Sequence, residues 1–155
     1  MHRLLPPRLV LVCVVVSVAL GVPVPVLGPL PDALRLIGIP VVAGGLWLAV
    51  ANARRFELAG ANIVTSLDPT AFVTDGAFRW SRNPMYLGFL LLATGVACGV
   101  GSLSAFVGPL VFFAAADRWY IPFEERRMSD VFGDEYQRYR SVVRRWVGRR
   151  SVSAT

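Results

Sequence analysis

Residues Ser81 to Gly88 read SRNPMYLG, and they stand where a polar connection meets an apolar run. Pro84 suits the first turn of a helix, because proline there lacks only a backbone N–H that the helix leaves unpaired. Asn83 is placed to cap that helix, and Tyr86 is an aromatic residue of the kind found where membrane helices meet water. The stretch therefore predicts that a membrane helix begins here.

The composition of the chain is that of a membrane protein. Of its 155 residues, 55% are hydrophobic and 17% are charged, and its mean hydropathy is +0.56, so it is far more apolar than a soluble domain of this length. All 16 basic residues are arginine and the single histidine is His2, which excludes lysine chemistry and argues against imidazole catalysis and histidine metal sites. Cys13 and Cys98 lie within apolar runs, so we expect buried thiols, no disulfide and no metal site.

Four apolar stretches reach or approach the roughly 17 to 25 residues that a helix needs to cross a bilayer. They cover about residues 9–27, 34–53, 85–100 and 103–121. The last two are joined by GVGSLS, which predicts a tight helical hairpin. The first stretch is also open to interpretation as a signal peptide, because basic residues precede it and the small-residue sequence ALG follows it. With that stretch retained, the sequence predicts an all-α integral membrane protein with about four transmembrane helices.

The arginines indicate the orientation. They cluster before the first stretch, between the second and third, and after the fourth, whereas the two opposite connections carry little charge. By the positive-inside rule both termini are expected on the cytoplasmic side of a bacterial inner membrane. The net charge of +6 is explained by contact with anionic lipid, so membrane lipid and not nucleic acid is the expected partner. The oligomeric state is not predictable from the sequence.

A different pattern follows the fourth stretch. Phe132, Tyr136, Tyr139, Val143 and Trp146 recur at helical spacing, which predicts one amphipathic helix that lies at the cytoplasmic membrane surface or folds against the bundle. We expect a single domain over residues 1–155, with its motifs between about residues 65 and 147 and a disordered tail over residues 148–155.

Polar side chains gather on the cytoplasmic side in two segments, at residues 65–86 and 117–127. Because the third and fourth stretches form a hairpin, these segments are expected to lie close together. Glu124 and Glu125 also suit the start of a helix, so a structural role stays open. Asp117 and Arg118 lie inside an apolar run, where charges are costly and are often functional.

SRNPMYLG and the later PFEERRMSDVFGDEYQRYRSVVRRW together resemble the isoprenylcysteine carboxyl methyltransferase superfamily, which includes phospholipid N-methyltransferases. That pattern is Arg-(His or Asn)-Pro-x-Tyr-x-Gly, then Glu-Glu, Phe-Gly-x-x-Tyr-x-x-Tyr and an Arg-Trp-like pair. The resemblance implies an integral membrane enzyme that uses S-adenosylmethionine to methylate a lipid-like acceptor at the cytoplasmic face. Asn83 stands where the prenylcysteine enzymes have histidine, so the acceptor is either a carboxylate or an amine.

The resemblance also implies a set of site residues. Carboxylates would pair with the cationic groups of the cofactor, Arg82 or Arg144 would hold its carboxylate, and tyrosines would stack on it. Methyl transfer needs positioning and exclusion of water and no metal. The implied cofactor-binding residues are Arg82, Asn83, Pro84, Tyr86, Gly88, Glu124, Glu125, Tyr136 and Tyr139, and the implied catalytic residues are Glu125 and Arg144.

Two alternatives remain at this level. Membrane reductases that use NADPH share a related core and an Arg-x-Pro-x-Tyr-like motif, although a nicotinamide dinucleotide is large for so short a chain. A non-enzymatic membrane protein would keep the motif only to begin helices and to anchor its surface helix.

Overall fold

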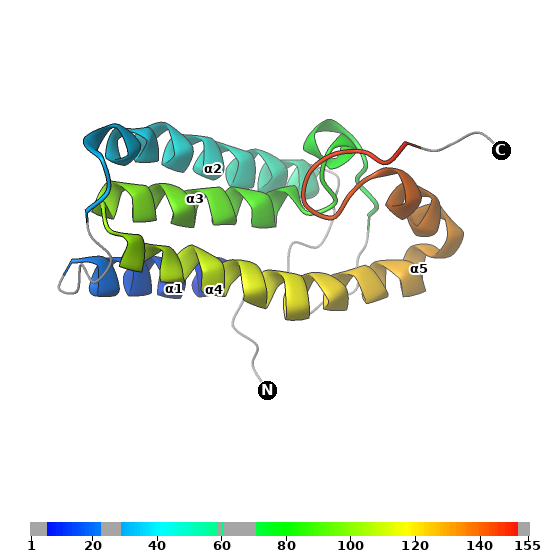
Figure 1. Cartoon of the computed structure of the whole chain (residues 1–155). Helices are drawn as coiled ribbons and strands as arrows, with labels where there is room; N and C mark the ends of the chain where they lie inside the picture. Colours follow the sequence, from blue (N-terminus) through cyan, green and yellow to red (C-terminus); the bar gives the residue numbers. More distant parts are fainter. Residues whose placement is uncertain (1–5, 23–28, 59, 61–70, 152–155) are drawn as a thin grey trace.

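The computed structural model describes residues 6–22, 29–58, 60 and 71–151. Every regular element in these ranges is a helix, which confirms the all-α class for this part of the chain (Figure 1). The elements are α1 (Pro6–Gly21), α2 (Asp32–Leu58), η1 (Gly76–Arg79), α3 (Pro84–Val100), η2 (Leu103–Phe106), α4 (Val107–Ala115), η3 (Ala116–Tyr120) and α5 (Ile121–Val142).

The four long apolar stretches form a helical bundle. In Figure 1, α3 lies between α2 on one side and α1 with α4 on the other, and α5 extends past the end of the bundle. Among the described helices, α2 alone combines a length of 27 residues with enough apolar character to cross a membrane, whereas α1 and α3 are apolar but shorter. The arrangement with four spans therefore stays a prediction.

Glycines bring α2 and α3 into close contact. A Cβ atom added to Gly45 would lie 2.7 Å from the carbonyl oxygen of Gly88, and one added to Gly38 would lie 2.5 Å from that of Gly95. These pairs run in opposite directions along the two helices, so α2 and α3 are antiparallel. Small residues allow such close approach of helix backbones, where van der Waals contacts replace bulky side chains.

The predicted hairpin between the third and fourth stretches is present. α3 ends at Val100, and Gly101 adopts the left-handed conformation with a φ of 77°, which glycine adopts without strain. Its carbonyl accepts a 2.8 Å hydrogen bond from the backbone N–H of Leu30. The turn is thus tied to the connection before α2.

The predicted C-terminal amphipathic helix is present as α5, but it is continuous with the fourth apolar stretch. α4, the π-helical turn η3 and α5 follow one another without a break from Val107 to Val142, so the fourth apolar stretch continues directly into the polar helix. Gly133 then kinks α5, with a φ of 47°. The helix ends at Val142, so Val143 and Trp146 are not part of a helical stripe.

Residues Val143 to Arg150, here called the C-terminal segment, fold back over the end of the bundle (Figure 1). Val143 is extended and pairs with Arg149 in an isolated antiparallel bridge. The backbone N–H of Gly148 donates to the carbonyl of Trp80 at 2.6 Å. Residues 148–150 of the predicted disordered tail thus belong to this hydrogen-bonded segment, and residues 152–155 lie outside the described part of the chain.

Candidate functional site

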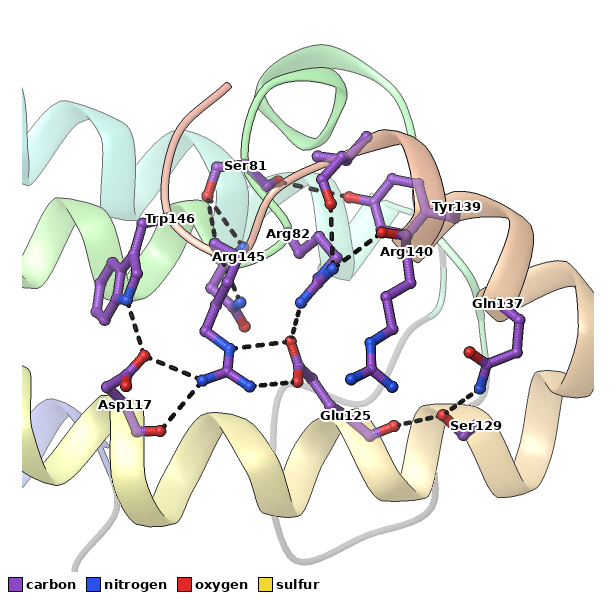
Figure 2. Close-up of polar contacts among 12 residues, drawn as sticks. Ser81, Arg82, Asp117, Glu125, Ser129, Gln137, Tyr139, Arg140, Arg145 and Trp146 are labelled. Atoms are coloured by element: carbon purple, nitrogen blue, oxygen red, sulfur yellow. Dashed lines mark hydrogen bonds and ion pairs between the residues drawn. The ribbon is translucent and has the colours of Figure 1, made fainter. Parts of the chain in front are cut away.

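The two polar segments meet at the end of the bundle, as the predicted hairpin requires. The loop that carries η1, the first turn of α3, the start of α5 and the C-terminal segment converge there (Figure 2). Part of the first polar segment, residues 65–70, lies outside the described residues.

A buried carboxylate lies at the centre of the site. The side chains of Glu125 and Arg82 are only 7% and 5% exposed, and Arg82 Nη2 donates to Glu125 Oε1 at 2.5 Å. Arg145 donates to the same carboxylate through Nε at 3.3 Å and Nη2 at 2.8 Å. Its Nη1 donates to Asp117 Oδ1 at 3.1 Å. Two arginines and two acids thus form one network, in which opposite charges offset the cost of burial.

The network sets the charge states of its members. Burial alone would raise the pKa of Glu125, but hydrogen bonds and charges from Arg145 and Arg82 outweigh it and hold the pKa below its usual value. The hydrogen bond to Glu125 raises the pKa of Arg145, and that to Asp117 adds to this shift. Glu125 is therefore ionised at neutral pH and, being fully paired, is a weak base.

Asp117 also fixes the C-terminal segment through a tryptophan. The indole Nε1 of Trp146 donates to Asp117 Oδ1 at 3.0 Å, and its ring lies 4.9 Å from that of Phe113. Asp117 belongs to the π-helical turn η3, a kind of turn that is frequent at functional sites. The bonds from Trp146 and Arg145 explain how the charged Asp117 is tolerated inside an apolar run of the sequence.

Residues of the SRNP stretch bind the backbone of the C-terminal segment. Arg82 Nη1 donates to the carbonyls of Val143 at 3.1 Å and Arg140 at 3.2 Å. The side-chain amide of Asn83 donates to the carbonyl of Arg145 at 3.1 Å. Asn83 occupies the residue before the first turn of α3 but makes no capping hydrogen bond, so its predicted capping role is wrong: its side chain points to the C-terminal segment instead.

Aromatic residues form one wall of the site. The ring of Phe72 lies 5.3 Å from that of Phe132, 5.9 Å from that of Tyr136 and 5.4 Å from that of Tyr139. Burial, with the charge of Glu125, raises the pKa of Tyr136 to about 12. The apolar stripe of α5 is therefore covered by Phe72 from the loop before η1, and its phenols are neutral at physiological pH.

Tyr86 faces the second acid of the pair. Its hydroxyl donates to Glu124 Oε1 at 2.7 Å, and the residue is only 5% exposed. Tyr86 is thus a core residue of α3, and not the exposed interfacial aromatic that its position in the sequence predicts.

The structure separates the predicted site residues into three groups. Arg82, Asn83, Glu125, Tyr136 and Tyr139 lie at the convergence point, and Tyr86 with Glu124 forms an adjacent pair. Pro84 and Gly88 are buried in α3, where Gly88 packs against α2.

The arginine predicted to be catalytic lies elsewhere. The Arg144 side chain is exposed, and only its backbone carbonyl contacts the site, by accepting from the N–H of Arg82 at 3.1 Å. Arg145 makes the ion pairs. The sequence analysis missed Arg145, Trp146 and Phe72 as site residues, although Arg145-Trp146 is itself the Arg-Trp pair of the motif.

One buried donor in this site is unpaired. Arg82 Nε has no hydrogen-bond partner among the described residues, although both terminal nitrogens of the same guanidinium are bonded. A buried N–H without an acceptor is rare and costs free energy. The chemical partner of such a donor is an anionic or carbonyl oxygen.

Comparisons with known proteins identify the family of the chain. The family model described as phospholipid methyltransferase matches residues 34–135. A protein-S-isoprenylcysteine O-methyltransferase of Schizosaccharomyces pombe is 35% identical over 74 residues, 46% of this chain and 30% of that enzyme. Methanethiol S-methyltransferase 1 of Bradyrhizobium diazoefficiens is 34% identical over 96 residues, 57% of this chain and 32% of that enzyme.

An uncharacterized protein of Haemophilus influenzae is 36% identical over 63 residues, which are 41% of this chain and all of that protein. No solved structure matches the chain. The chain spans about a third of the length of the two named methyltransferases that it matches. With the family model matching well over half of its residues, the chain belongs to the phospholipid methyltransferase family of membrane methyltransferases.

Proposed function

We propose that the protein transfers a methyl group from S-adenosylmethionine to a lipid-like acceptor at the cytoplasmic face of the bacterial inner membrane. The observation that carries the proposal is the buried Arg82, whose Nε has no acceptor among the described residues although both of its terminal nitrogens are paired. A carboxylate is the ligand group that such a guanidinium binds best, and the methionine part of S-adenosylmethionine carries one.

The other residues of the site fit the rest of that cofactor. The carboxylate of Glu124, next to Tyr86, would attract a sulfonium or ammonium group. Phe72, Tyr136 and Tyr139 form an aromatic wall that would stack on a purine or face the cation. When bound, S-adenosylmethionine supplies an activated methyl group on sulfur.

The chain's own residues would then position and shield the reaction. Glu125 and Arg145 hold Arg82 in place, and the C-terminal segment closes the end of the bundle over them. A carboxylate acceptor is already a nucleophile and needs only alignment and exclusion of water. An amine acceptor must also lose a proton, and Glu124 is the better candidate for accepting it, because Glu125 is neutralised by two arginines.

The hydrophobic acceptor is proposed to enter from the lipid phase. Trp47, Leu36 and Ile39 of α2 are exposed, as expected of helices surrounded by lipid, and we place α1, α2, α3 and the α4 region in the membrane. Both named relatives are methyltransferases, which favours methyl transfer over the NADPH-dependent reductase alternative.

The test is transfer of label from methyl-labelled S-adenosylmethionine into the organic extract of membranes that contain the protein. The parent should label a lipid, and the mass of that lipid identifies the acceptor. Glu125→Gln should abolish the labelling, whereas Glu135→Gln, an exposed acid of the same helix, should retain it. Absence of both labelling and cofactor binding with the parent would support the non-enzymatic alternative.

A further inference from the structure

Asn52 is a fully buried polar residue that belongs to none of the motifs discussed so far. It is 1% exposed, and its amide nitrogen donates to the carbonyl of Leu48 at 2.7 Å. That bond fixes the orientation of the amide, because the reversed orientation would place two oxygens against each other. The amide oxygen, Oδ1, is then buried without a partner among the described residues. Such an acceptor calls for an explanation.

The packing of α2 against α3 places Asn52 beside the SRNP stretch. A Cβ atom added to Gly88 of α3 would lie 2.7 Å from the carbonyl oxygen of Gly45 and 2.8 Å from the nitrogen of Ala49 in α2. One turn beyond Ala49 along α2 is Asn52, and one turn before Gly88 along the antiparallel α3 is Pro84. Asn52 therefore lies on the face of α2 that packs against the first turn of α3.

That first turn does not provide a donor for Asn52. Pro84, which is fully buried like Asn52, has no backbone N–H. The side-chain amide of Asn83 is directed to the carbonyl of Arg145 instead. The close contact at Gly45 and Gly88 prevents the two helices from sliding to bring a more distant donor into reach.

We propose that Asn52 Oδ1 accepts a hydrogen bond from an N–H or O–H group of S-adenosylmethionine bound at the adjacent SRNP stretch. This inference rests on the proposed function. The donors available on that cofactor are the ammonium of its methionine part, the exocyclic amine of its adenine and the hydroxyls of its ribose. Asn52 would thus be a cofactor-binding residue contributed by α2, and its amide oxygen and Arg82 Nε are the two buried side-chain atoms without a partner among the described residues.

The test compares binding of labelled S-adenosylmethionine to the parent, Asn52→Leu and Asn52→Ala, each as the full chain in lipid nanodiscs. Both variants should weaken binding by about tenfold, the effect of losing one good hydrogen bond. Thr94→Val is the matched control, because the Thr94 hydroxyl makes the same local bond, to the carbonyl of Leu90 at 2.8 Å, on α3. It should bind like the parent.

Thermal unfolding without ligand separates binding from folding. In Asn52→Leu, which keeps the side-chain volume, removing a buried acceptor that has no partner should leave the midpoint unchanged or raise it, whereas Asn52→Ala leaves a cavity and should lower the midpoint. Competition by adenosine and by methionine identifies the part of the cofactor that donates to Asn52. The competitor that binds the Asn52 variants more weakly than it binds the parent carries that donor. Parent-like binding in both variants, or a loss of binding in Asn52→Leu that follows a lowered unfolding midpoint, would overturn the inference. If the parent itself binds no cofactor, the proposed function fails and the inference with it.

Discussion

Arg145 donates two hydrogen bonds to the carboxylate of Glu125, from Nε at 3.3 Å and from Nη2 at 2.8 Å, although the two residues are 20 positions apart in the sequence. This contact joins the start of α5 to the C-terminal segment, which lies beyond the far end of the same helix. The kink at Gly133 and the reversal after Val142 bring the two together. The geometry of the site thus depends on the C-terminal segment folding back toward the start of α5.

Glu125→Gln should destabilise the protein by about 3 kcal/mol, because it leaves the buried Arg82 without a countercharge and leaves Arg145 paired with Asp117 alone. Unfolding in detergent, followed by circular dichroism, measures this cost. Glu135→Gln on the exposed part of α5 is the control. Equal stability of the two variants would show that the cluster is not held by charge.

The two neighbouring arginines should behave differently. Arg145→Met removes charge-assisted hydrogen bonds to Glu125 and Asp117, so we expect a loss of about 2 kcal/mol and of methyl transfer. Arg144→Met removes an exposed side chain and should stay within about 0.5 kcal/mol of the parent with activity retained. A severe loss of activity in Arg144→Met alone would restore the role that the sequence predicts for it.

Acidification should weaken the fold through Glu125. Its folded pKa lies below the ordinary value of 4.5, so its contribution to stability is fully present above that value and is lost as the pH falls through the folded pKa. Unfolding midpoints measured between about pH 7 and pH 3 should fall in the acid range, less steeply in Glu125→Gln than in the parent. Parallel profiles would contradict this assignment.

Asn83→Ala should loosen the C-terminal segment, because it removes the hydrogen bond to the carbonyl of Arg145. The expected cost is about 1 kcal/mol. Trypsin should then cleave faster at the exposed Arg149, with the rest of the bundle intact by mass spectrometry. An unchanged rate would show that Asn83 does not restrain this segment.

Adjacent glycines of α2 provide a test of helix packing. Gly45→Ala places a Cβ atom 2.6 Å from the backbone nitrogen of Leu92, so α2 and α3 must move apart at a cost of about 1 to 3 kcal/mol. At Gly44 nothing lies within 4 Å of the added atom, and Gly44→Ala should be neutral or stabilising. Similar unfolding midpoints for both variants would rule out close contact of α2 with α3.

Local signals in the sequence were enough to predict several elements. Pro84 marks the start of α3 and Gly101 its end, because proline and left-handed glycine act on their immediate neighbours. The apolar stretches predict the helices of the bundle, and the hairpin predicts that the two polar segments meet. The SRNPMYLG and Glu-Glu motifs also predicted the methyltransferase family, which the family model confirms.

The tertiary structure alone decided which side chains meet. The hydrogen bond from the Arg82 N–H to the Arg144 carbonyl joins residues more than sixty positions apart and turns the Arg145 side chain toward Glu125. The helical spacing of apolar residues continues as far as Trp146, so it could not predict that the chain reverses after Val142. That reversal depends on contacts with the residues between η1 and α3, which are distant in the sequence. The burial of the Asn52 amide oxygen without a partner among the described residues likewise follows from the approach of α2 to α3. Composition and local turns determine which helices form, whereas contacts between distant segments determine the chemistry where those helices end.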